Sequence, residues 1–261
     1  MTIIRINLEE TMQIIRLATA VVLSTLPVAT NAQSLAADLQ RVSGVAAYQK
    51  ILDAVPADDL SSVLEQKDSN GDTLLIAAAK SLNIELFDLL VTYGADPSAR
   101  DANRRNLLNI AVRRSSPLIA RRALDAGTDP RSFTLRFQGS ALIFASARGE
   151  VEIVKMLIEA GAPLDRVNTL GWSALLEATV LGDGGPAHQE IVRLLLDAGA
   201  DPTIADHDRI TPHEHAIRRG HHELADIFLL FNGISSGRCG VCTNREWGIM
   251  SDSGEPNSPN Q

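Results

Sequence analysis

Apolar and polar stretches alternate in a repeating order from about residue 73 to residue 231 of the chain. In each cycle a Thr, Ser or Asn opens a short apolar run, a polar break follows, and a second apolar run ends near a glycine. The second runs carry apolar residues at helical spacing, as Ile153, Val154 and Leu157 do. Each cycle therefore predicts two short helices joined by a turn and followed by an extended loop.

The cycle has a nearly constant length. Glycines that close successive cycles are separated by 33, 34 and 38 residues, and they are Gly94, Gly127, Gly161 and Gly199. A period of this size is the mark of a solenoid, in which each unit packs on the next. The residues whose side-chain oxygens can cap the first helix of each unit are Thr73, Asn106, Ser140, Ser173 and Thr211.

The motif inside each cycle resembles the ankyrin repeat. The family's pattern is T-P-L-H-x-A-A followed by G-H-x-E-I-V-x-L-L-L-x-x-G-A-D. It is matched best by residues 149–162, by residues 190–201 and by the last cycle, which carries Thr211-Pro212. The resemblance implies an all-α solenoid of about five helix-turn-helix repeats with short hairpin-like loops. Within an ankyrin repeat domain at 68–233, the expected repeats are 68–100, 101–132, 133–166, 167–205 and 206–233.

Three stretches depart from the family pattern. Asn106 and Asn109 weaken the motif of the second unit, and residues 133–138 replace a loop that should begin with Asp. Residues 181–188 (LGDGGPAH) carry about four extra residues, which explains the 38-residue step. Glycine and proline there predict an enlarged loop between the two helices, since loops lengthen at small thermodynamic cost.

The segments on either side of the repeats differ in character. Residues 33–67 lack the motif but have helical apolar spacing, so they are expected to form an N-terminal helical cap over the first repeat. Residues 234–261 form a tail that contains a C-x-x-C motif and ends in the polar stretch SDSGEPNSPNQ. That composition predicts a largely disordered tail.

The first residues have the features of a signal peptide. An apolar run at 17–29 follows Arg16, and the small residues before position 33 suit cleavage after Ala32, so residues 1–32 are expected to be removed. The acidic pair at 9–10 suits such a peptide poorly, which favours Met12 as the true start. A periplasmic or secreted location follows, with no membrane insertion after cleavage. The alternative is a buried first helix.

Charge and motifs narrow the function. The chain carries a formal net charge of -8, which disfavours general binding to nucleic acid. It has no phosphate-binding loop, no nucleophile elbow and no paired-histidine zinc motif, the nearest approach being His222-Glu223 followed by Asp226. We therefore expect a protein that is not an enzyme and needs no cofactor.

Histidine and cysteine leave an alternative open. Five of the six histidines lie in 207–222, and metal candidates among them are His213, His215, His221 and His222. Their ordinary role in this repeat is loop hydrogen bonding, so no metal is expected. Cys239 and Cys242 are expected to form a disulfide in an exported protein, with redox or metal chemistry and free thiols as alternatives. Together these residues support the alternative to a binding scaffold, namely a metal-handling or redox accessory protein that uses the histidine-rich last repeat with Cys239 and Cys242.

The resemblance implies a partner protein bound on the concave face, which inner helices and loop tips form. Cations close most of the inner helices, beginning with Lys80, and form a basic stripe that suits an acidic partner. Helix dipoles also favour cations at these positions, which is the alternative explanation. Trp172 is expected to be an exposed anchor, unless it packs on a neighbouring loop. We expect a monomer whose partner-binding residues are Arg104, Arg105, Arg113, Arg114, Phe137, Arg148, Trp172, Ile210, Arg218 and Arg219.

Overall fold

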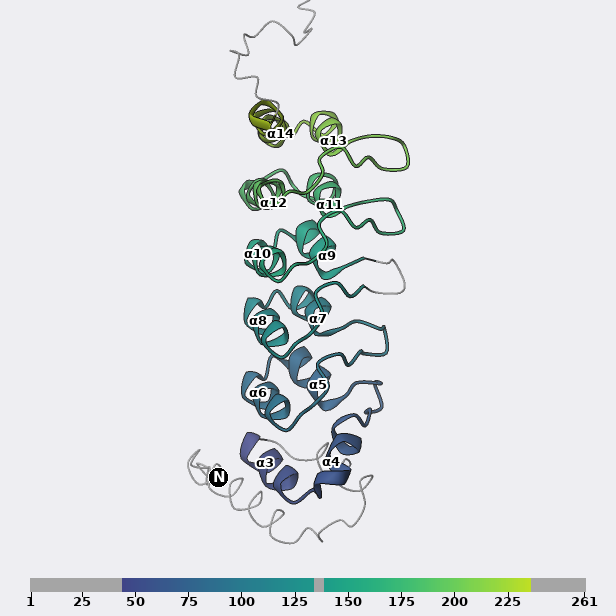
Figure 1. Cartoon of the computed structure of the whole chain (residues 1–261), viewed down its shortest axis with the longest axis vertical. Helices are drawn as coiled ribbons and strands as arrows, with labels where there is room; N and C mark the ends of the chain where they lie inside the picture. Colours follow the sequence, from purple (N-terminus) through teal and green to yellow (C-terminus); the bar gives the residue numbers. More distant parts are fainter. Residues whose placement is uncertain (1–43, 134–138, 236–261) are drawn as a thin grey trace, which may run out of the picture.

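The computed structural model describes residues 44–133 and 139–235, which form one row of stacked helix pairs (Figure 1). One column contains the first helix of each pair, here called the inner helices: α5 (Leu74–Ser81), α7 (Leu107–Arg113), α9 (Ala141–Arg148), α11 (Ala174–Val180) and α13 (Pro212–Arg218). The second column contains the outer helices: α6 (Ile84–Thr92), α8 (Pro117–Asp125), α10 (Val151–Glu159), α12 (Pro186–Asp197) and α14 (His222–Ser235). The predicted all-α solenoid is confirmed, and repeats one to five are numbered from α5/α6 to α13/α14.

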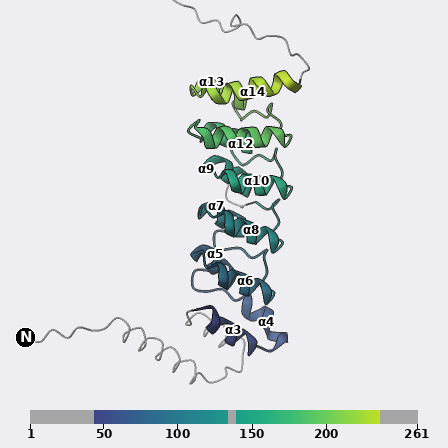
Figure 2. The same cartoon turned by 90° about the vertical axis from the view of Figure 1, so that its left-hand side faces the viewer.

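Loops extend from the inner column on the side away from the outer helices (Figure 1). Within the described ranges the only β-type pairing is an isolated bridge between Phe133 and Ser140. Figure 2 shows the helices lying across the long axis in successive layers. Each layer can therefore contact only its neighbours, as expected for a repeat array.

The inner helices begin where the capping residues predict. The side chain of each predicted cap accepts a hydrogen bond from the backbone N–H three residues later, at Ile76, Asn109, Ile143, Leu176 and Glu214. Thr211 and Glu214 complete a reciprocal capping box, and Pro212 occupies the first helical position. The glycines that close the first four units have φ between 78° and 95°, a conformation that a side chain would strain.

Small residues allow the inner helices to stack closely. One equivalent position in all five inner helices is alanine, with at most 1% of its surface exposed: Ala78, Ala111, Ala145, Ala178 and Ala216. Larger apolar side chains of the outer helices, such as Phe87 and Leu157, fill the space between the two columns and are at most 1% exposed. The core is thus continuous from layer to layer.

Two further helices cover the open side of the first repeat. Helix α3 (Val45–Asp53) contacts α6, and α4 (Ala57–Leu64) follows it. Leu52, Val63 and Leu64 are each at most 1% exposed and extend the core below repeat one. The side chain of Tyr93 donates a hydrogen bond to the carboxylate of Asp53, which ties α3 to the end of α6.

The extra residues of the fourth repeat do not all lie in a loop. Helix α12 starts at Pro186 and is 12 residues long, whereas α6, α8 and α10 have nine residues each, so part of the insertion adds a helical turn. His188, in that added turn, is 8% exposed. Its Nδ1 lies 2.9 Å from Oδ1 of Asp183, and its Nε2 lies 3.4 Å from the carbonyl oxygen of Ala147 in repeat three. The insertion therefore connects two adjacent repeats.

Several sequence predictions fall outside the described residues. These are the signal peptide at 1–32, the loop residue Phe137, and the tail with Cys239 and Cys242. Among the helices that are described, none combines the length and hydropathy that crossing a membrane requires.

Candidate partner-binding face

The exposed side chains of the inner helices and of the loop tips form one side of the solenoid, here called the inner face. It corresponds to the concave face that the family resemblance implies. A pocket of about 300 Å³ opens there between repeats one and two. It is lined by four cationic side chains and one apolar one: Lys80, Arg105, Ile110, Arg113 and Arg114. We call it the basic pocket.

Two of the four cations are neutralised by carboxylates beneath them. Nζ of Lys80 lies 2.7 Å from Oδ2 of Asp72 and 3.2 Å from Oδ2 of Asp101. Nη2 of Arg105 lies 2.6 Å from the same Asp101 oxygen. Burial alone would raise the pKa of Asp101, but hydrogen bonds from Arg105 and Lys80 hold that pKa below its usual value. This network joins the loops of repeats one and two.

Arg113 and Arg114 are different, because their charges are not compensated. Both are exposed at the end of α7, and neither guanidinium has a hydrogen bond or an ion pair with any residue in 44–133 or 139–235. The pocket therefore keeps two free guanidinium groups in a chain whose formal net charge is -8. Free guanidinium groups suit planar, bidentate binding of carboxylates.

The remaining predicted cations do not join this pocket. Nη2 of Arg148 donates to Oγ of Ser115 at 3.3 Å, and its Nε lies 3.7 Å from Glu150, so it bridges repeats two and three. Arg104 is exposed at a loop tip, where its φ is 60°. Arg218 and Arg219 are exposed at the end of α13, in repeat five. The predicted basic stripe thus divides into the basic pocket, the bridging Arg148 and the separate pair Arg218 and Arg219.

Trp172 differs from the exposed anchor that the sequence predicts, because it is half-buried. Its backbone closes the loop of repeat four: its N–H donates to Oδ1 of Asn168 at 3.1 Å, and its carbonyl accepts from the N–H of Asn168 at 3.1 Å. Ile210 is half-buried at the equivalent place in repeat five. Leu170, at the tip of the same loop as Trp172, is 52% exposed. It was not predicted, although a leucine beside the turn glycine Gly171 was a visible signal.

Two polar pairs lie under the loops of repeats four and five at equivalent positions. Nδ2 of Asn168 donates to Oε1 of Glu177 at 2.7 Å, and Nε2 of His215 lies 2.7 Å from Oδ2 of Asp206. Glu177 is only 5% exposed, and this burial raises its pKa to about 7, although the Asn168 hydrogen bond opposes the shift. Each pair holds a loop onto its inner helix.

The histidines of the last repeat are dispersed among structural contacts. His215 binds the loop carboxylate of Asp206, the ring of His213 lies 6.2 Å from that of Phe228, and the ring of His221 packs against Gly184. His222 is exposed on the outer column. Within the described part of the chain, no group of three or more His, Cys, Asp or Glu side chains converges on a point where a metal ion could be held.

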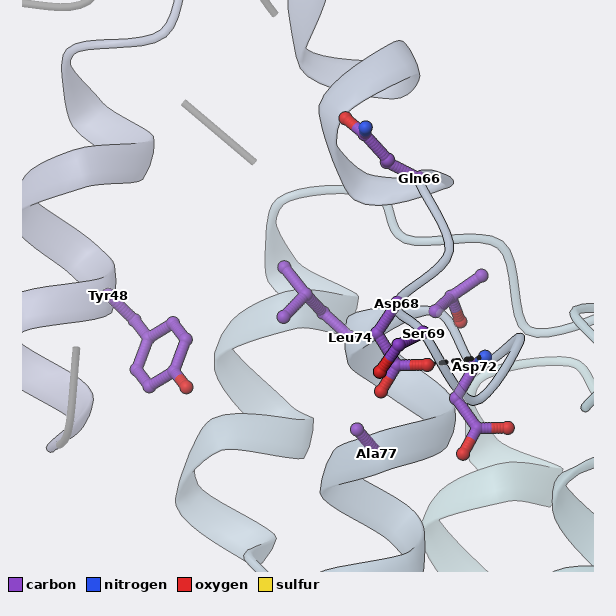
Figure 3. Close-up of a pocket in the computed structure, with 8 residues that line it drawn as sticks. Tyr48, Gln66, Asp68, Ser69, Asp72, Leu74 and Ala77 are labelled. Atoms are coloured by element: carbon purple, nitrogen blue, oxygen red, sulfur yellow. Dashed lines mark hydrogen bonds between the residues drawn. The ribbon is translucent and has the colours of Figure 1, made fainter. Parts of the chain in front are cut away.

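A second pocket, of about 270 Å³, lies between α3 and the start of α5 (Figure 3). Its carboxylates already have partners. Oδ1 of Asp68 accepts hydrogen bonds from the N–H groups of Asn70 and Asp72, at 2.8 and 2.9 Å. Although partial burial opposes the change, these hydrogen bonds lower the pKa of Asp68. The pocket thus has no uncompensated charge of the kind found at Arg113 and Arg114.

The fold and the inner face define a helical repeat solenoid of the protein-binding class. Two family models match the chain, one for three copies of the ankyrin repeat at residues 108–206 and one for a single ankyrin repeat at residues 70–102. The chain belongs to the ankyrin repeat family. Proteins of this family are generally not enzymes.

Known relatives agree with this membership. The ankyrin repeat protein YahD of Escherichia coli (strain K12) is 34% identical over 163 residues, which cover 62% of this chain and 81% of YahD. A crystal structure of an ankyrin repeat domain from Acinetobacter baumannii AYE has a TM-score of 0.67 and 37% identity, covering 77% of this chain and 96% of that one. A glycerophosphocholine phosphodiesterase of Schizosaccharomyces pombe is 34% identical over 93 residues, which are 36% of this chain but only 8% of that enzyme.

Proposed function

We propose that this protein is a non-enzymatic scaffold that acts in the periplasm, or outside the cell, by binding an acidic segment of another protein. The observation that carries the proposal is the pair Arg113 and Arg114, whose guanidinium groups are free inside a pocket on the inner face. The signal-like sequence at 1–32 supports the location.

The basic pocket is organised before a partner arrives. Lys80 and Arg105 are held by Asp72 and Asp101, so the cationic wall loses little freedom on binding. Two carboxylates of a partner would replace water around Arg113 and Arg114 and form charge-assisted hydrogen bonds. Since the rest of the chain is acidic, an acidic segment is repelled elsewhere and directed to this pocket.

The test is crosslinked capture from the native periplasm with the tagged mature chain, read by mass spectrometry. The double variant Arg113→Ala/Arg114→Ala should lose the captured protein, because hydrogen bonds to charged groups contribute about 1.5–3 kcal/mol each. The matched control is Arg218→Ala/Arg219→Ala, which removes the same two charges from the end of α13. Trp172→Ala, made separately, tests the half-buried loop residue.

Three outcomes decide between the parts of the proposal. Loss of one abundant protein only in the Arg113/Arg114 variant, with unchanged helicity and melting, supports the basic pocket. Equal capture by all variants would mean that the inner face of repeats one and two is not the binding surface. A chain recovered from the cytoplasm with its first residues intact would refute the periplasmic location.

A further inference from the structure

The last repeat exposes an apolar side chain at a position that the preceding repeats bury. Ile217 occupies a position of α13 whose equivalents in the other inner helices are each 0% exposed: Ala79, Val112, Ser146 and Thr179. Ile217 itself is 37% exposed, because no further layer of the described structure lies beyond α13 and α14. Solenoids normally end in a repeat with a polar outer side, since this end would otherwise expose the core.

The last outer helix departs in another way, because an exposed position that is polar in the other repeats is apolar here. Leu230 is 68% exposed, and Leu229 beside it is 39% exposed. In the four preceding outer helices the position of Leu230 is also exposed but polar, and it is occupied by Thr92, Asp125, Glu159 and Asp197. Because this position is exposed in every repeat, Leu230 lies on the outer side of α14, and the last repeat is the one described repeat that has an apolar residue there.

One substitution in the last repeat, a histidine in place of leucine, is consistent with an end of the solenoid that is only partly covered. His213 stands where the other inner helices have leucine at no more than 1% exposure, namely Leu75, Leu108, Leu142 and Leu175. Its ring is half-buried and lies 6.2 Å from the ring of Phe228. A short segment across α13 and α14 would leave one edge of this end in contact with water, whereas a complete repeat would bury it.

We propose that the segment 239–250 folds back over this end and covers Ile217, Leu229 and Leu230. It is separated from the end of α14 only by residues 236–238, and it brings Trp247, Ile249 and Met250 as an apolar cluster between polar stretches. The segment 236–261 does not repeat the capped two-run pattern of the repeats, so the cover is a short clasp.

The chain is long enough for this return. Residues between Ser235 and Trp247 span at most roughly 40 Å when extended, and adjacent helix layers are only about 10 Å apart. The motif Cys239-Gly-Val-Cys242 lies within this return, where a disulfide between the two cysteines would shorten the connection. The clasp thus gives the C-x-x-C motif a structural use and is independent of what the inner face binds.

The two tryptophans of the chain, Trp172 and Trp247, make a direct test possible. In the full-length mature chain, Trp172→Phe leaves Trp247 as the only tryptophan. We expect a blue-shifted emission and an acrylamide quenching constant several-fold below that of the same chain in urea. Adding Leu230→Glu should shift the emission to the red and restore rapid quenching. The matched control is Leu118→Glu, which places the same charge at a 50% exposed leucine on α8 and should leave Trp247 protected.

Other results would overturn the clasp. If Trp247 is quenched as rapidly in the folded chain as in urea, with normal helicity, the segment does not cover the end. If its protection appears only at high protein concentration and light scattering gives a dimer, a second copy covers the end instead. If Leu118→Glu exposes Trp247 as much as Leu230→Glu does, the contact is not at α14.

Discussion

Replacing Glu177 by Gln should stabilise the protein, and the gain should depend on pH. Glu177 is 5% exposed on α11, and burial raises its pKa from 4.5 to about 7. Between these two values the folded chain binds more protons than the unfolded chain at this site. The free energy of unfolding therefore falls as pH rises through this window, and the cost is complete above the folded pKa.

The size of the effect follows from the shift. At 1.36 kcal/mol for each pH unit, the interval from 4.5 to about 7 corresponds to a cost of roughly 3 kcal/mol for ionised Glu177. Gln keeps the oxygen that accepts the hydrogen bond from Nδ2 of Asn168 and carries no charge at any pH. Glu177→Gln should therefore match the wild type near pH 4 and exceed it by roughly 1–3 kcal/mol at pH 8.

Urea unfolding of both proteins at several pH values between 4 and 8 measures this difference. Glu190→Gln is the control, because it removes an exposed carboxylate from α12 at nearly the same distance along the solenoid. A difference between Glu177→Gln and wild type that stays constant with pH would refute the reasoning. A gain that is largest at pH 4 would have the wrong sign and would refute it as well.

Two further changes test the contacts between repeats. Asp101→Asn removes the carboxylate that holds Lys80 and Arg105, and it should lower the free energy of unfolding by roughly 1–3 kcal/mol at pH 7, measured by urea unfolding. The pKa of Asp101 in the folded chain lies below its usual value of 3.8, so its carboxylate stabilises the fold above pH 3.8 and loses this effect as pH falls through the folded pKa. If Asp101→Asn lowered the free energy of unfolding equally at pH 7 and at pH 3, the result would contradict the ion network. Gly182→Ala should lower the melting temperature, because the added Cβ would lie 2.1 Å from the carbonyl oxygen of Ala178 and 2.6 Å from the ring of His188. Since the nearer atom belongs to the backbone, adding His188→Ala should not restore the melting temperature, and a full rescue would show that the side chain alone causes the strain.

The repeat architecture was predictable because local and periodic signals agree. The capping residue and the apolar spacing recur in every unit and the closing glycine in the first four, and each acts within a few residues of itself. Thr73 and Thr211, which lie four repeats apart in the sequence, cap their helices in the same way. Such signals can be recognised in the sequence without knowing which residues are in tertiary contact.

The site was less predictable, because it depends on which charges meet between layers. Lys80 and Arg113 look alike in the sequence, since each lies in the last turn of an inner helix, yet Lys80 is neutralised by Asp72 and Asp101 while Arg113 is free. Asp101 pairs with Lys80 across two repeats, and the sequence pattern contains no sign of this contact. The burial of Glu177 was also missed, although the equivalent residues Ala77, Ile110 and Phe144 are apolar and gave a usable signal.

The polar pairs under the loops of repeats four and five have a consequence for how copies of this repeat can be exchanged by recombination. In repeat four the loop provides the donor Asn168 and the helix provides the acid Glu177, whereas in repeat five the loop provides the acid Asp206 and the helix provides His215. A crossover that joined the loop of repeat five to the inner helix of repeat four would place two carboxyl groups together in a buried site. A recombination event that preserves these pairs must therefore move each loop together with the inner helix that follows it. The crossover point then lies after that helix and not between the loop and the helix.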